Sequence, residues 1–104
     1  MVRMHRHRQL PDLYRVRIKL YIEELIGQLQ VISERANSNI KSLERERNYV
    51  LETMEKVQKS FGDQRPGQQM VTELYHAINS MAFADSSLNA LRTAIDRYIN
   101  QLKK

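Results

Sequence analysis

The chain has 104 residues, of which three are Gly, two are Pro and none is Cys. This length suits one domain, and the absence of Cys excludes a disulfide framework, a thiolate metal site and a cysteine nucleophile. No run of about 18 apolar residues occurs, so we expect no membrane-spanning segment. The low Gly and Pro content, with Leu, Ile and Met at helical spacing, indicates an all-α chain.

The positive charge is concentrated near the N-terminus. Residues 1–20 hold six basic residues and one acidic residue, whereas the remainder of the chain holds 11 of each kind. The formal net charge of +5 therefore comes from the first fifth of the chain. We expect a flexible basic arm over residues 1–10, attached to a helical domain over residues 11–104. The basic residues of this region are Arg3, Arg6, Arg8, Arg15, Arg17 and Lys19.

The first long helix is predicted over residues 11–61. Pro11 and Asp12 suit a first helical turn, and Gly62 suits the left-handed residue that ends a helix. From Ile22 onward every seventh residue is apolar, and a second apolar set lies three or four residues from the first, which predicts a continuous apolar seam. The first set is Ile22, Leu29, Ala36, Leu43, Val50 and Val57, and the second is Leu25, Ile26, Ile32, Ile40, Met54 and Phe61.

A loop over residues 62–68 and a second helix over residues 69–103 complete the predicted fold. The dipeptide Pro66-Gly67 is typical of a turn, and a short loop makes consecutive helices antiparallel neighbours. The predicted fold is therefore a long antiparallel helical hairpin that resembles a coiled coil, with a basic N-terminal extension. The second helix repeats apolar residues by seven at Leu74, Met81, Leu88, Ile95 and Leu102.

Folding back at this loop sets one register between the two seams. In that register the two charged residues that interrupt the seams, Arg47 and Asp85, fall opposite each other. The register follows from the loop and the apolar residues alone, so the opposition of these two charges supports it independently. Leaving either charge alone would cost several kcal/mol, so the pair should penalise other registers. The expected facing pairs include Phe61 with Met70 and Val50 with Met81.

Apolar side chains remain outside this predicted hairpin. The second helix is expected to end opposite Leu29, so the apolar residues that precede Leu29 in the first helix lack a partner. A narrower apolar stripe lies on the far side of the second helix. A two-helix hairpin is marginally stable alone. We therefore expect a subunit that self-association or a helical protein partner completes as a bundle. The predicted partner-binding residues are Leu13, Tyr14, Ile18, Tyr21, Ile22, Leu25, Ile26, Phe83, Ala90 and Ala94.

No pattern typical of catalysis or of cofactor binding is present. His5 and His7 have no third metal ligand at a suitable spacing, His76 has no residue spaced to orient it as a base, and no Gly-rich phosphate loop occurs. We therefore predict a non-enzymatic protein-interaction module without a cofactor or small-molecule substrate. It would serve as a subunit, adaptor or chaperone of a larger assembly.

The basic N-terminal region leaves alternatives open. Its arginines with Tyr14 and Tyr21 would suit a nucleic-acid-binding accessory protein. Its interspersed apolar residues suit an acidic-rimmed helical partner or an anionic membrane surface equally well. We expect an intracellular, cytoplasmic chain, while the Arg-rich start with a single acid leaves import into an organelle open.

Overall fold

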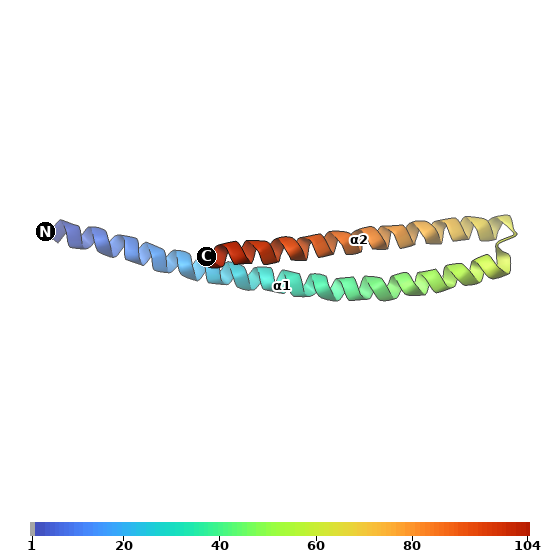
Figure 1. The fold of residues 1–104 in the computed structure, drawn as a ribbon, viewed down its shortest axis with the longest axis horizontal. Coiled ribbons are helices and arrows are strands. Elements are labelled where there is room, and N and C mark those ends of the chain that lie inside the picture. The colour runs from blue at the N-terminus through green and yellow to red at the C-terminus, as the bar shows by residue number, and fades with distance from the viewer. Residues whose placement is uncertain (1) are drawn as a thin grey trace.

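The computed structural model describes the backbone of residues 2–104 and the side chains of residues 13–104. The described chain consists of two helices, α1 (Val2–Phe61) and α2 (Arg65–Lys103). The chain reverses direction between them, so the helices lie side by side and antiparallel (Figure 1). The predicted all-α helical hairpin is thus confirmed.

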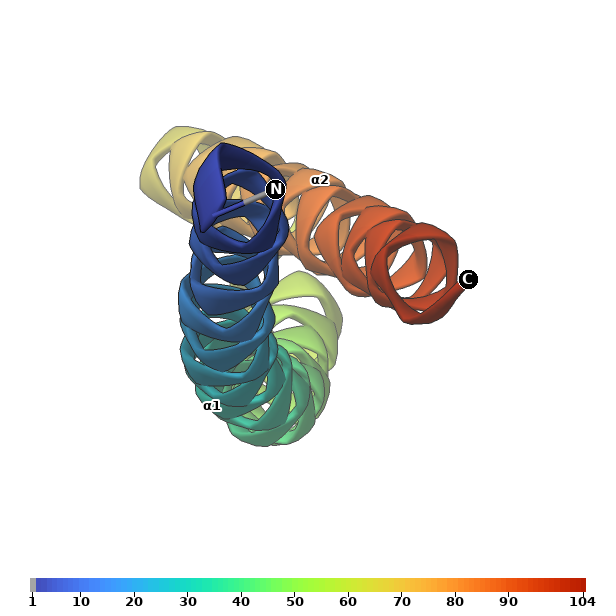
Figure 2. The same ribbon diagram turned by 90° about the vertical axis from the view of Figure 1, so that its left-hand side faces the viewer.

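The hairpin is long, narrow and unequal in its two arms. Its extents are 91 × 17 × 16 Å, and seen end-on α1 curves while α2 crosses the view along a diagonal (Figure 2). α1 has 60 residues and α2 has 39, a difference of about 30 Å at about 1.5 Å per residue. The first part of α1 therefore extends beyond the end of α2 (Figure 1). We call residues 2–24 of α1 the overhang.

The beginning of α1 differs from the prediction. The helix start predicted at Pro11 differs from the structure, in which α1 begins at Val2, whereas the flexibility predicted for residues 1–10 stays a prediction. Arg, Met, Gln and Leu have high helix propensity, whereas the predicted boundary depended on Pro11 and Asp12. Met1 and the side chains of residues 2–12, including those of Arg3, Arg6 and Arg8, lie outside the described residues.

The connection between the helices is shorter than the predicted loop over residues 62–68. It comprises only residues 62–64, because α2 begins at Arg65 rather than at residue 69. Pro66 lies in the first turn of α2, where its missing N–H leaves no helical hydrogen bond unmade. The Gln68 side chain reaches back across the turn and donates a hydrogen bond of 3.1 Å to the carbonyl oxygen of Gly62. Pro66-Gly67 therefore starts a helix instead of forming the turn.

The two glycines at this turn are required because a side chain would not fit there, and not because the backbone has an unusual conformation. No described glycine has a positive φ, so the left-handed stop expected at Gly62 is wrong. A Cβ at Gly62 would collide with the carbonyl of Gln58, and a Cβ at buried Gly67 would collide with the carbonyl of Phe61. Gly67 thus lies against Phe61, so the predicted pairing of Phe61 with Met70 is wrong. The side chains of Phe61 and Met70 are each about half exposed.

The core is a single line of contact residues between the two helices. Along each helix these residues follow alternating spacings of four and three, and all except Phe61 are buried or half-buried. Burial is greatest around Ala36, which is 3% exposed, together with Ile40, Ile95 and Ile99. Leu25 and Ile32 lie off this line, and Ile32 is 45% exposed. The line is residues 26, 29, 33, 36, 40, 43, 47, 50, 54, 57 and 61 of α1 and residues 67, 71, 74, 78, 81, 85, 88, 92, 95, 99 and 102 of α2.

The two glycines at positions 67 and 27 offer a matched test of this turn. Gly67→Ala should destabilise the hairpin by more than about 1 kcal/mol, because the added methyl collides with backbone at Phe61. Gly27→Ala meets nothing within 4 Å and should be neutral or stabilising by up to about 1 kcal/mol through helix propensity. Urea unfolding followed by circular dichroism measures both. Equal stability of the two variants would contradict the close approach at Gly67.

Candidate functional site

The end of α2 and the adjoining part of α1 form a groove of about 430 Å³, which we call the end groove. Its apolar floor joins Ile22 and Ile26 of α1 to Leu102 of α2. Ile22, Leu25 and Ile26, expected to be without a partner beyond α2, are half-buried, so α2 covers this segment in part. The residues that line the groove are Arg15, Ile18, Lys19, Ile22, Glu23, Ile26, Leu102, Lys103 and Lys104.

The described part of the overhang exposes its apolar side chains to solvent. Tyr14 and Tyr21 are each 66% exposed, and no element of the described chain packs over them. The partner-binding role of Tyr14 and Tyr21 stays a prediction. The exposed apolar residues of the overhang are Leu13, Tyr14, Val16, Ile18, Leu20 and Tyr21.

The outer face of α2 carries the second predicted stripe. Phe83 is 76% exposed, and Ala90 and Ala94 on the same side are also exposed. Because two alanines add little apolar area beside one phenylalanine, this stripe is much smaller than the overhang. Tyr49, which is 72% exposed, was not predicted as an exposed apolar residue, because it lies outside the heptad seam.

The basic residues of the overhang do not share one face. Arg15 and Lys19 line the end groove, whereas Arg17 does not. At about 100° per residue, Arg17 lies about 200° around the helix from Arg15. All three side chains are exposed. The overhang is therefore basic on more than one side, and only two of these three charges adjoin the apolar floor of the groove.

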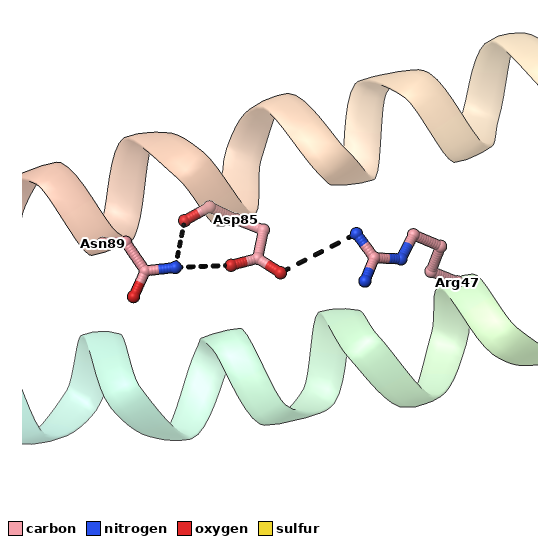
Figure 3. Close-up of polar contacts among 3 residues, drawn as sticks. All are labelled: Arg47, Asp85 and Asn89. Atoms are coloured by element: carbon pink, nitrogen blue, oxygen red, sulfur yellow. Dashed lines mark hydrogen bonds and ion pairs between the residues drawn. The ribbon is translucent and has the colours of Figure 1, made fainter.

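Arg47 and Asp85, the two charged residues in the middle of the seam, lie close enough to form the predicted ion pair. Arg47 Nη1 is 3.8 Å from Asp85 Oδ2, with side chains that are 34% and 13% exposed. Asn89 lies one turn further along α2 and donates through Nδ2 to Asp85 Oδ1 at 2.7 Å (Figure 3). The same Nδ2 donates to the Asp85 backbone oxygen at 3.2 Å. The more buried carboxylate therefore has two partners, and Arg47 remains near enough to the surface to contact water.

A third charged residue in the seam was missed at the sequence level. Arg92 occupies the contact position between Leu88 and Ile95, and its Nε is buried without a hydrogen-bond partner. The four-and-three spacing of α2 could have identified it, but the heptad series was read only through its apolar members. A groove of about 360 Å³ adjoins this residue and is lined by Gln30, Ser33, Glu34, Asn37, Arg92, Asp96 and Ile99.

The described residues also bear on metal binding and membrane insertion. No group of three His, Cys, Asp or Glu side chains able to hold a metal ion occurs in the described part of the chain. His5 and His7 lie outside the described side chains. Neither α1 nor α2, within the residues described, has a stretch long and apolar enough to cross a membrane.

Comparison with known proteins gives no relative from which a function could be transferred. No family model, curated protein or solved structure matches the chain.

The polar pair in the seam predicts an asymmetric mutational result. Arg47→Leu should destabilise the hairpin by about 1–3 kcal/mol, because it leaves the more buried Asp85 carboxylate without its cation. Asp85→Leu should cost less, because Arg47 can extend into water. The double variant should recover most of the loss caused by Arg47→Leu.

Urea unfolding of the two single variants and the double variant measures these effects as a double-mutant cycle. Asn89→Ala serves as a control that removes one hydrogen bond to Asp85 but keeps the ion pair. Strictly additive losses for Arg47→Leu and Asp85→Leu would show that the two side chains do not interact.

Proposed function

We propose that this chain is a non-enzymatic interaction module that serves as a subunit, adaptor or small chaperone of a larger assembly. It binds a helical protein partner, or a second copy of itself, through the end groove and the overhang. The observation that carries the proposal is the row of exposed apolar side chains on the overhang, including two tyrosines that are each 66% exposed.

The physical basis is the unbalanced length of the two helices. Where α2 is present it covers the seam of α1, and residues such as Ala36 and Ile95 are buried. α1 continues beyond the end of α2 (Figure 1), and its apolar side chains from Leu13 to Tyr21 are exposed there. Contiguous exposed apolar surface with a polar rim is typical of protein-interaction sites, and tyrosines are enriched at such interfaces.

Nucleic-acid binding is the second candidate, and the exposed side chains of Arg15, Arg17 and Lys19 beside Tyr14 and Tyr21 favour it. Cations contact phosphates and aromatic rings stack on bases in single-strand binders. Against this reading, the remainder of the chain beyond residue 20 is electrically balanced. A groove with an apolar floor is also a poor fit to a phosphate backbone. We therefore rank this candidate below a protein partner.

Affinity capture with the full chain tests the proposal. The chain should retain a protein in stoichiometric amount, or a second copy of itself, and Ile22→Gln with Leu25→Gln and Ile26→Gln should abolish this retention. Tyr49→Gln with Leu51→Gln and Tyr75→Gln is the matched control, because it removes exposed apolar side chains outside the end groove and overhang. Circular dichroism verifies that each variant keeps its helices.

Two outcomes would contradict the proposal. The first is a sharply melting monomer by light scattering that captures no protein. The second is retention of nucleic acid alone, with an affinity that falls steeply with salt and is lost on removal of residues 1–10. The second outcome would establish the nucleic-acid candidate instead.

A further inference from the structure

The contact line of α1 continues past the end of α2 and changes its chemistry there. Going backward from Leu29, the three-and-four spacing passes through Ile26 and Ile22 and then through Lys19 and Arg15. On the α1 face that α2 covers, apolar positions thus give way to basic ones where α2 ends. A helix that continued the path of α2 would meet two isoleucines first and two cations next.

The end groove brings these residues together with the end of α2. Lys103 and Lys104 from α2 join Arg15 and Lys19 from α1, and Glu23 is the one acidic residue among those that line the groove. Three positive charges therefore remain uncompensated around a floor of Ile18, Ile22, Ile26 and Leu102. A ligand that fits this surface must present apolar side chains in its centre and negative charge at its edges.

We propose, as an extension of the proposed function on which it rests, that the end groove binds an acidic amphipathic helix of a partner protein. The partner helix lies in line with α2 and packs along the overhang of α1, where the hairpin has no second helix. Its apolar side chains pack on Ile22, Ile26 and Leu102. Its carboxylates pair with the cations of the groove, chiefly Arg15 and Lys19.

Three other occupants fit less well. A second copy of the overhang would bring Arg15 and Lys19 against a surface that is equally basic. A membrane-surface helix needs one apolar face, but Arg15 and Arg17 lie about 200° apart around α1. A nucleic acid would place phosphates over the apolar floor, which offers them no hydrogen-bond donor. Each of these remains a possible outcome of the experiment below.

Two synthetic helical peptides serve as probes. Both are about three heptads long with leucine at the contact positions. One carries glutamate at the flanking positions and its twin carries lysine there. In fluorescence anisotropy the full-length chain should bind the glutamate peptide at least about tenfold more tightly than the lysine twin. The difference should shrink as salt rises, because the Debye length falls from about 10 Å at 0.1 M to about 3 Å at 1 M.

Charge reversal on the protein provides the decisive variant. Arg15→Glu with Lys19→Glu should invert the preference, so that the lysine peptide binds more tightly. Arg17→Glu with Arg35→Glu changes the net charge by the same amount at exposed positions outside the groove and should leave the preference unchanged. Ile22→Gln with Ile26→Gln should abolish binding of both peptides.

The proposal is overturned if the two peptides bind equally or if the charge-reversed variant still prefers glutamate. The proposed function would survive that result if affinity capture still depended on Ile22, Leu25 and Ile26. It is also overturned if neither peptide binds and the chain instead forms a dimer in sedimentation, or binds phosphatidylserine vesicles or a nucleic-acid duplex. If capture also retains no protein, the proposed function fails together with the inference.

Discussion

The hairpin depends on two series of contact residues, one on each helix, that both alternate at spacings of four and three and meet in a single register. This spacing keeps one narrow face of each long helix turned toward the other. Val50 and Met81 line one shared groove near the middle of the hairpin, and Ile26 and Leu102 line another at its open end. The two helices therefore stay in contact from the middle of the molecule to the end of α2.

Polar residues within this line weaken the seam but make its alignment specific. Arg47 and Asp85 meet in the observed register. A shift by one heptad would set Asp85 against Ile40 or Met54 and would set Arg47 against Ile78 or Arg92, so both charges would lose their partner. Ser33 and Arg92 further reduce the apolar contact between the helices. Only four apolar residues in the described chain are buried. A hairpin with so small a core gains considerably from a helix that covers its remaining apolar surface.

The sequence was sufficient to predict the helices, their antiparallel pairing and the opposition of Arg47 to Asp85, because heptad periodicity records which face of a helix is covered. It was insufficient at the ends of the elements. Pro66-Gly67 is compatible with both a turn and a helix start, and only the close approach of Gly67 to Phe61 decides between them. The end groove was also not predictable as a groove, because Lys103 and Lys104 join Arg15 and Lys19 only after the chain folds back.

Cysteine cross-linking tests the register most directly, since the chain has no native Cys. Val50→Cys with Met81→Cys should form a disulfide within one chain under mild oxidation, because these positions line one groove between the two helices. Val50→Cys with Leu74→Cys, and Val50→Cys with Leu88→Cys, report a shift of one heptad in either direction and should remain reduced. A cross-link to Leu74→Cys or Leu88→Cys, or one that forms only between two chains, would contradict the hairpin described here.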